Sequence, residues 1–497
     1  MRPVALFAVI LFASAATAAD PKPASFTLTF DPGKLAEPFT GRVVVVLSPR
    51  APAPVVRGLN WGNPEPAFAV DVKGWKPGTP LTVGADALGT VPLKEVKPGR
   101  YFAQAVLDRD LGGISFAASP GNLYSKPVEL KEFDPAAAGD TALTLDQVAT
   151  EPEFKETDAV TLVDVESKLL TKFHGRPTRM RAGVVLPPSF TKEADRKYPV
   201  VYEIPGFGGD HFAAFGAARR KAWDLAGTEA IWVVLDANCR LGHSVFADSA
   251  NNGPVGTALV EELIPHIEKT YRGVGKPAAR LVTGHSSGGW SSLWLQVAYP
   301  DAFGGCWSTS PDPVDFRDFQ RVDLYTPSAN LFTDPKGERR ALSRGSGRGV
   351  MYFDSFSRME EVMGRGGQLE SFEAVFSPRG KDGKPLKLWD RKTGAINPDV
   401  AEAWEPYDIS LKLKREWATL GPKLAGKVHV YMGDEDTFYL DGAARLLKRR
   451  VAKLGSDAVV EMFPGKTHAL VDAKLRERMN KEMAAAISRA EPVRDGK

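Results

Sequence analysis

Cysteine, net charge and long apolar runs are all scarce in this chain, and each shortage narrows what the protein can be. Two cysteines, Cys239 and Cys306, occur among 497 residues, and the pair does not fit a metal site. The formal net charge is only +3, with acidic and basic residues interspersed, so neither nucleic acid nor an electrostatic membrane anchor is indicated as a partner. After the N-terminus no apolar stretch is long enough to span a bilayer. Membrane insertion is therefore not expected.

The N-terminus is typical of a secretory signal peptide. Arg2 supplies the positive end, residues 4–13 form a short apolar core, and residues 16–18 provide a small-residue cleavage site. No cysteine lies near that site, so a lipid anchor is not expected. We expect residues 1–19 to be removed by cleavage near Ala18 or Ala19, and the mature protein to be secreted or periplasmic.

Export would place both cysteines in an oxidising compartment, where a disulfide can form. Such a bond requires the α-carbons of Cys239 and Cys306 to lie within about 7 Å, which the sequence does not test. Two separate, small buried side chains are the favoured interpretation.

The length allows two or three domains, and the pattern changes near residue 150. Before it, short alternating runs at 25–30, 41–47 and 101–107 are separated by Gly and Pro turn signals. Residues 20–150 are therefore predicted to form a small all-β sandwich of immunoglobulin-like type. A linker is expected at about residues 133–146.

Residues 151–490 predict an α/β domain. Two strands, at 167–173 and 180–186, come before an alternation of strands and helices. Further strands are expected at 198–204, 230–235, 280–283, 303–308, 428–432 and 459–463. Near-continuous apolar strands with helices between them indicate a mostly parallel sheet covered on both faces. The alternation lapses at about 311–420, which we interpret as a cap insertion over the site.

The most informative motif is GHSSG at residues 284–288. It follows the apolar run 281–283 and precedes residues with helical spacing at Trp290, Leu293, Trp294 and Val297. A G-x-S-x-G between a strand and a helix predicts a nucleophile elbow, with Ser286 exposed at the start of the helix. The free N–H groups there can stabilise an oxyanion.

A serine nucleophile needs a base and an acid that orients the base. His468 is the favoured base among seven histidines because it lies in a loop just past the last predicted strand. His285 is set aside because its side chain is expected to point away from the serine. Asp436 follows the preceding strand and is the favoured acid, with Asp434 as the alternative. The order Ser286, Asp436, His468 is that of the α/β-hydrolase fold.

The oxyanion hole requires two backbone donors. Ser287, the residue after the nucleophile, is expected to provide one. The other is expected from the Gly-rich loop at residues 205–209, with Phe207 as the candidate donor.

Together, the loop at 205–209, the elbow and the segments around Asp436 and His468 resemble the esterase D-like α/β-hydrolases. That group includes enterochelin, feruloyl and acetyl-xylan esterases, S-formylglutathione hydrolases and mycolyltransferases. The resemblance covers about residues 167–485, and one departure is Pro205, where many relatives have histidine. It also suggests that the loop at 248–254 borders the site. Candidate substrate-binding residues are Ser249, Asn251 and Asn252, with His243 and Arg240 as weaker ones; a turn that caps the next helix is an equal interpretation.

The conclusion from the sequence is a secreted serine hydrolase that cleaves carboxylic esters through an acyl-enzyme. The ester could be of a carbohydrate, a phenolic acid or a siderophore, and Trp404, with Trp389 and Tyr407, could stack on it, although core packing is the commoner role of such side chains. No metal or organic cofactor is implied, and the oligomeric state is left open. The alternatives are an acyltransferase or peptidase of the same fold, and a non-catalytic surface- or carbohydrate-binding protein.

Overall fold

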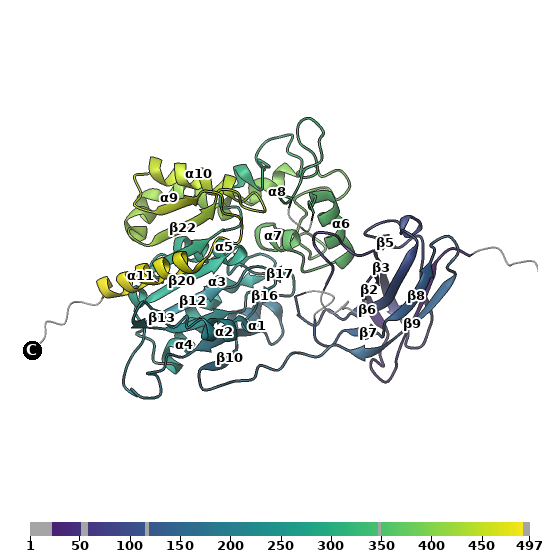
Figure 1. The fold of residues 1–497 in the computed structure, drawn as a ribbon, viewed down its shortest axis with the longest axis horizontal. Helices are drawn as coiled ribbons and strands as arrows, with labels where there is room; N and C mark the ends of the chain where they lie inside the picture. The colour runs from purple at the N-terminus through teal and green to yellow at the C-terminus, as the bar shows by residue number, and fades with distance from the viewer. Residues whose placement is uncertain (1–21, 51–57, 115–118, 346–348, 491–497) are drawn as a thin grey trace, which may run out of the picture.

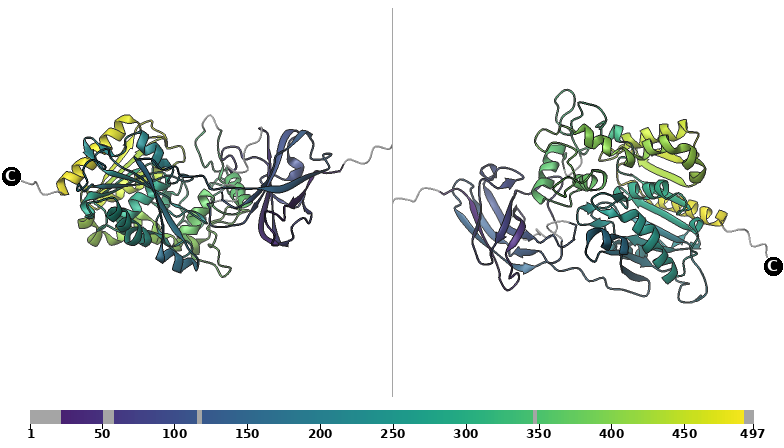
Figure 2. Two further views of the ribbon diagram at one scale, coloured as in Figure 1. Left: turned by 90° about the horizontal axis from the view of Figure 1, so that it is seen from below. Right: turned by 180° about the vertical axis from the view of Figure 1, so that it is seen from behind.

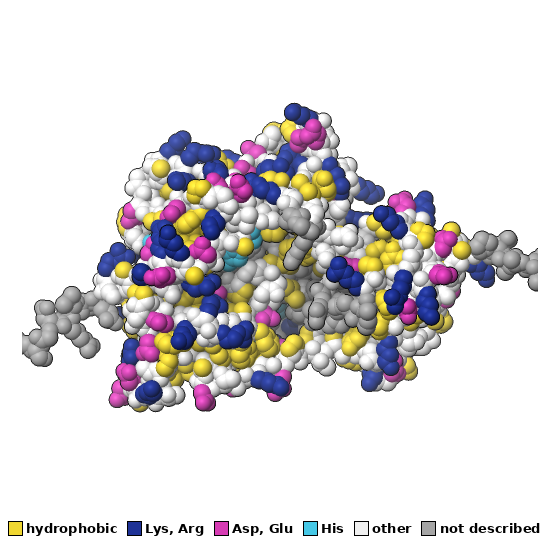
Figure 3. All heavy atoms as spheres, viewed as in Figure 1, with side chains coloured by type: hydrophobic (Ala, Val, Ile, Leu, Met, Phe, Trp, Pro, Cys, Tyr) yellow, Lys and Arg dark blue, Asp and Glu magenta, His cyan; other side chains and the backbone are white. Residues whose placement is uncertain are grey.

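The structure is a computed structural model that describes residues 22–50, 58–114, 119–345 and 349–490. The expected signal segment, residues 1–19, lies outside these ranges. An all-β region forms one end of the molecule, and helix α11 (Ala473–Ala490) lies toward the other (Figures 1 and 2). Within the described ranges, no helix has the length and hydropathy needed to cross a membrane. Basic and acidic side chains are interspersed over the face seen in Figure 3.

The N-terminal region contains only strands and one short 3₁₀ helix among its described residues. Its nine-stranded sheet has the order β4-β1-β9-β7-β6-β2-β3-β5, and β8 pairs with β6. The strands are β1 (Ser25–Phe30), β2 (Phe39–Ser48), β3 (Ala67–Trp75), β4 (Leu81–Val83), β5 (Leu88–Gly89), β6 (Gly99–Asp108), β7 (Leu123–Ser125), β8 (Val128–Phe133) and β9 (Asp140–Val148). Alternate residues of β1, namely Phe26, Leu28 and Phe30, are buried in a core shared with β2, β6 and β9. The prediction of an all-β N-terminal region is confirmed, while its immunoglobulin-like type stays a prediction. The linker expected at 133–146 is wrong in its second half, because those residues belong to β9, which pairs with β1 and β7.

The second sheet is mixed, with one antiparallel edge. Its order is β10-β11-β15-β12-β20-β21-β22-β23. Strand β11 runs antiparallel to both of its neighbours, and the remaining pairs from β15 to β23 are parallel. The strands are β10 (Val160–Glu166), β11 (Arg179–Val185), β12 (Val200–Ile204), β15 (Ile231–Leu235), β20 (Arg280–His285), β21 (Gly305–Thr309), β22 (Val428–Gly433) and β23 (Val459–Phe463).

Helices cover both faces of this sheet, as the buried strands require. Alternate residues of β20 show this: Leu281 packs with α2 (Ala213–Arg219) and α11, while Val282 belongs to the core on the opposite face. That face is covered by α4 (Ile264–Thr270), α5 (Ser287–Ala298), α9 (Ile409–Leu424) and α10 (Asp441–Lys453). The predicted α/β-hydrolase fold class is confirmed.

One predicted strand is wrong. Residues 167–173 form most of helix α1 (Lys168–His174), because both helix ends are capped. The Ser167 side chain accepts from the Leu170 N–H, and Gly175 adopts the left-handed conformation at the C-terminus. The strand lies one segment earlier, at β10.

The region expected to be a cap contains α6 (Phe353–Met363), α7 (Gln368–Phe376) and α8 (Pro398–Ala403). Helices α6 and α7 lie between the mixed sheet and the all-β region (Figure 1). The segment between β15 and α4 forms helix α3 (Val255–Ala258) and short antiparallel strand pairs. One more short strand pair precedes β15. These strands are β13 (Asp224–Leu225) with β14 (Thr228–Glu229), β16 (Asn238–Cys239) with β17 (Gly242–His243), and β18 (Asp248–Ser249) with β19 (Gly253–Pro254).

Candidate active site

The GHSSG motif forms a sharp turn from β20 into α5. Ser286 lies between the two elements with φ 59° and ψ −123°, a conformation that L-residues rarely adopt. A Cβ on Gly284 would lie 2.1 Å from the Gly288 carbonyl oxygen, and one on Gly288 would lie 1.9 Å from the Ile204 carbonyl oxygen. Because backbone atoms cannot yield to such contacts, glycine is required at both positions.

An imidazole and a buried carboxylate meet beside this turn. Nδ1 of His468 lies 2.7 Å from Oδ2 of Asp436, whose side chain is fully buried. The other carboxylate oxygen of Asp436 accepts the Phe438 N–H at 2.8 Å. An Asp436 carboxylate makes Nδ1–H the donor, so Nε2 of a neutral ring is left as the acceptor.

Asp434 occupies a different place. Its carboxylate accepts the Gly465 N–H at 2.7 Å, across the two loops that follow β22 and β23. The structure therefore brings Asp436, and not Asp434, to His468.

Phe207 and Ser287, the expected oxyanion donors, belong to segments that lie next to Ser286. A Cβ on Gly206 would lie 3.2 Å from Cβ of Ser286, so the loop 205–209 passes directly over the serine. Ser287 is the first residue of α5, where backbone N–H groups have no carbonyl one turn earlier in the helix. Both N–H groups are thus supplied by segments that contact Ser286.

His243 is hydrogen-bonded to the loop 205–209 and holds it in place. Its Nδ1 accepts the Val245 N–H at 3.1 Å, which places the proton on Nε2. Nε2–H then donates to the Pro205 carbonyl oxygen at 3.1 Å. Burial lowers the pKa of His243 to about 4, so the ring stays neutral and keeps this pattern. His243 is a positioning residue for the loop.

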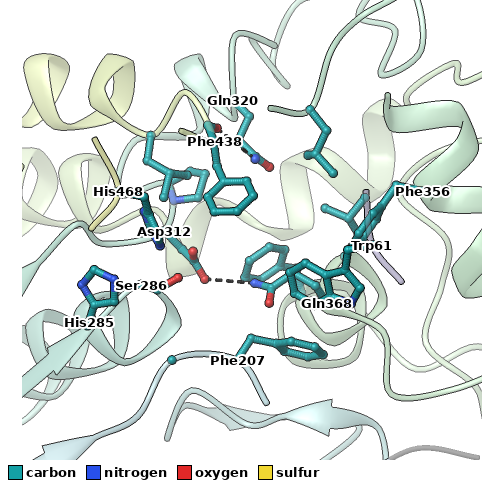
Figure 4. A pocket seen from close by; sticks show the side chains of 16 residues that line it. Trp61, Phe207, His285, Ser286, Asp312, Gln320, Phe356, Gln368, Phe438 and His468 are labelled. Carbon is teal, nitrogen blue, oxygen red and sulfur yellow. Dashed lines mark hydrogen bonds between the residues drawn. The ribbon is translucent and has the colours of Figure 1, made fainter. Parts of the chain in front are cut away.

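Ser286 and His468 line a common cavity of about 270 Å³ (Figure 4). Its walls are mostly apolar. The residues that line it are Trp61, Gly206, Phe207, His285, Ser286, Asp312, Pro313, Gln320, Leu342, Phe356, Gln368, Leu369, Phe372, Phe438, Leu440 and His468. An apolar cavity with a few polar groups is typical of a small-molecule binding site.

Comparison with family models matches residues 175–468 to the esterase family described as "Putative esterase". The match covers more than half of the chain. The chain belongs to this esterase family. It is an ester-hydrolysing enzyme, and the resemblance predicted from the motifs is confirmed.

Solved structures similar to the esterase have low identities. They include an S-formylglutathione hydrolase from Agrobacterium tumefaciens, with 16% identity, a TM-score of 0.41, and coverage of 67% of this chain and 95% of that chain. A ferulic acid esterase from Anaeromyces mucronatus has 13% identity, a TM-score of 0.33, and coverage of 68% and 95%. A fluorophosphonate-binding serine hydrolase from Staphylococcus aureus has 12% identity, a TM-score of 0.40, and coverage of 66% and 98%. No curated protein matches the chain.

His285 lies closer to the chemistry of the esterase than the sequence suggested. Its ring centroid is 4.7 Å from that of His468, and it lines the cavity beside Ser286. Figure 4 shows the His285 ring on the opposite side of Ser286 from Trp61 and Phe356, and the expectation that its side chain points away from the serine stays a prediction. Burial lowers the pKa of His285 to about 4, with a further contribution from the neighbouring His468. Because His285 stays neutral, it adds no positive charge beside His468.

Asp312 is a cavity residue that the sequence reasoning missed. Its carboxylate accepts the Ser287 hydroxyl at 2.6 Å and the Gln368 amide at 3.3 Å, and Gln368 also donates to the Ser287 hydroxyl at 3.1 Å. Helix α7 of the cap thereby holds the residue after the nucleophile. The signal that could have found Asp312 is its position directly after β21, at the carboxyl edge of the sheet.

Burial raises the pKa of Asp312 from its ordinary 3.8 to about 6. The folded chain therefore holds a proton that the unfolded chain loses between about pH 4 and 6, and the free energy of unfolding falls across that window. Asp312→Asn should remove this decline, so its stability relative to the parent should increase by about 2 kcal/mol between pH 4 and pH 7. Urea unfolding at both pH values measures the difference, and a pH-independent difference would contradict the raised pKa.

The polar residues expected to bind substrate do not line this cavity. The Asn251 side-chain amide donates to the carbonyl oxygens of Ala374 and Ser377, at 3.1 and 2.8 Å. Ser249 Oγ accepts the Asn252 N–H at 2.9 Å. Ser249, Asn251 and Asn252 therefore shape their own loop and fasten it to helix α7, which agrees with the structural interpretation of this segment.

The three cap aromatics expected to stack on a substrate, Trp404, Trp389 and Tyr407, do not line the cavity. Trp404 is fully buried, donates to Ser377 Oγ at 2.9 Å and packs on Phe376. Trp389 is buried as well, and Tyr407 donates to the Asp248 carbonyl oxygen. Trp404 is thus placed in the core of the cap and not against the cavity.

Neither cysteine of the esterase forms a disulfide. Cys239 and Cys306 are free, as the favoured interpretation of the sequence expected, but only Cys306 is fully buried, while Cys239 is half-buried. Burial raises the pKa of each thiol to about 12, which keeps both protonated.

Proposed function

We propose that the enzyme cleaves carboxylic esters through a covalent acyl-enzyme on Ser286. His468 takes the Ser286 proton through Nε2 as the oxygen attacks the ester carbonyl, and then returns it to the departing alkoxide. Water, activated by the same ring, releases the acid and frees the serine. The short contact between Nδ1 of His468 and the buried Asp436 carboxylate carries this proposal. That contact orients the ring and stabilises its charged form.

The oxyanion that forms on the carbonyl is held by the N–H groups of Phe207 and Ser287. Both groups belong to segments held by other contacts: His243 holds the loop before Phe207, and Asp312 and Gln368 hold the Ser287 side chain. Donors held in place before the reaction lower the barrier because they do not have to reorganise as charge develops.

Labelling with a fluorophosphonate probe tests the proposal directly. The probe should modify the wild-type chain at Ser286, identified by peptide mass spectrometry, and should block hydrolysis of p-nitrophenyl acetate. Labelling at another residue, or hydrolysis that survives complete labelling, would contradict the assignment. A non-catalytic binding protein with a hydrolase-like domain would not be labelled at all.

We also propose that the enzyme works outside the cytoplasm. The signal-like pattern of residues 1–19 is the support for export. Expression of the full chain in a Gram-negative host, followed by fractionation and N-terminal sequencing, should recover a periplasmic or secreted product that begins near Ala19. A cytoplasmic product with an intact N-terminus would contradict it.

A further inference from the structure

One wall of the catalytic cavity comes from the all-β region. Trp61 belongs to the segment between β2 and β3, far from the catalytic motifs in the sequence. Its ring centroid lies 5.5 Å from that of Phe207 and 5.3 Å from that of Phe356, perpendicular to the latter. In Figure 4, Trp61 and Phe356 lie across the pocket from Ser286 and His468. The indole is therefore placed where it can meet a bound substrate.

The segment that carries Trp61 is held by its own hydrogen bonds. The Asn60 side chain accepts the N–H groups of Gly62 and Asn63, at 2.9 and 3.1 Å. The Asn60 N–H in turn donates to the Glu65 carboxylate at 2.8 Å. Leu59 is only 8% exposed and belongs to the same hydrophobic cluster as the core of the catalytic region. Trp61 thus has a defined position.

The all-β region is also fastened to the cap. Arg365, just after α6, makes two hydrogen bonds to the Asp108 carboxylate, at 2.7 and 2.8 Å, and both side chains are buried. Arg358 on α6 donates to the Gly89 carbonyl oxygen at 2.8 Å. Separation of the two regions would break these buried hydrogen bonds and would expose apolar side chains of β2, β3 and β6 that belong to the same hydrophobic cluster as the catalytic core. The all-β region therefore does not swing freely away from the cavity.

We propose that Trp61 is a specificity-determining residue of the enzyme, which makes the all-β region a structural part of the active site. One of the two groups attached to the ester carbonyl enters the cavity and packs its apolar surface against the indole. Small groups leave the indole uncovered and gain nothing from it. This inference rests on the proposed function of Ser286, because it takes that residue as the point of attack.

Two ester series test the proposal on the full chain. One keeps the alcohol and varies the acyl group, with p-nitrophenyl acetate against p-nitrophenyl benzoate. The other keeps the acetyl group and varies the alcohol, with methyl acetate against 2-naphthyl acetate. The variants are Trp61→Ala and Trp61→Leu, with Asn63→Ala as a matched control because Asn63 is exposed in the same segment. Ratios of kcat/KM between bulky and small esters cancel the intrinsic reactivity of each substrate.

Trp61→Ala should lower the bulky-to-small ratio roughly tenfold in one of the two series, mainly through KM, and Trp61→Leu should lower it by less. The series that responds identifies the group that enters the cavity. Hydrolysis of the small esters should stay within about threefold of wild type, and Asn63→Ala should change no ratio. If Trp61→Ala does not fold, Trp61→Leu decides.

Unchanged ratios in both series, in variants with the wild-type circular dichroism spectrum, would overturn the proposal. An equal loss of kcat on small and bulky esters would also overturn it, since Trp61 would then act only by supporting Phe207. Failure of the proposed function looks different, because the wild-type chain would hydrolyse none of the esters and would not be labelled by a fluorophosphonate.

Discussion

Replacement of Ser286 by alanine is expected to reduce kcat on p-nitrophenyl acetate by roughly 10⁴-fold or more, since the nucleophile is lost and only binding and the oxyanion donors remain. The fold should survive because the change removes one hydroxyl from a cavity wall. Circular dichroism and the thermal midpoint of unfolding measure this second expectation. The variant should also lose fluorophosphonate labelling.

Ser287→Ala is a matched comparison for this experiment. It removes a neighbouring hydroxyl that donates to Asp312, but leaves the backbone N–H of residue 287 in place. We expect it to retain far more activity than Ser286→Ala. If Ser286→Ala keeps most of its turnover, the acyl-enzyme mechanism at this residue is wrong.

Asp436→Asn should reduce kcat by roughly 10³–10⁴-fold. An amide in place of the carboxylate offers an N–H to Nδ1 of His468, which favours the tautomer that carries its proton on Nε2. In that tautomer the ring cannot accept the Ser286 proton, and its charged form loses a counter-ion at 2.7 Å. Steady-state kinetics on a short ester measure the effect.

Asp434→Asn is the matched control, since it makes the same chemical change two residues away. Asp434 accepts the Gly465 N–H, and an asparagine carbonyl oxygen can do the same. We expect kcat within about threefold of wild type. The reverse result, a large loss for Asp434→Asn and a small one for Asp436→Asn, would assign the acid to Asp434.

Local sequence patterns were sufficient to predict the elbow and most strands of the mixed sheet. The two glycines around Ser286 are required because backbone atoms lie too close to leave room for a Cβ. The motif by itself therefore predicts the strained turn. The apolar runs predicted strands β12, β15, β20, β21, β22 and β23, because buried parallel strands are continuous hydrophobic segments in the sequence. The same approach failed at residues 167–173, where capping residues at both ends stabilise a helix in place of the predicted strand.

The roles of residues that depend on packing between distant segments could not be predicted from the sequence. Asp434 and Asp436 look alike in the sequence, and they are separated only by the direction in which their loop meets His468. Asn251 and Trp404 are residue types that are common in binding sites. Both are nevertheless buried, and each donates a hydrogen bond to Ser377 of the cap. Whether such a residue lines the cavity or is buried depends on how the helices and loops pack against one another.

The sequence by itself determined an α/β-hydrolase chain with a serine, an acid and a base after three strands of one parallel sheet, because parallel strands bring their carboxyl ends to a common edge. Only the tertiary structure decided that Asp436 lies against His468, that Asp312 lies beneath Ser287, and that Trp61 closes the cavity from the all-β region. The physical reason is that a local pattern specifies an element and the position of a residue within it. Contacts between elements are specified by the packing of the whole chain.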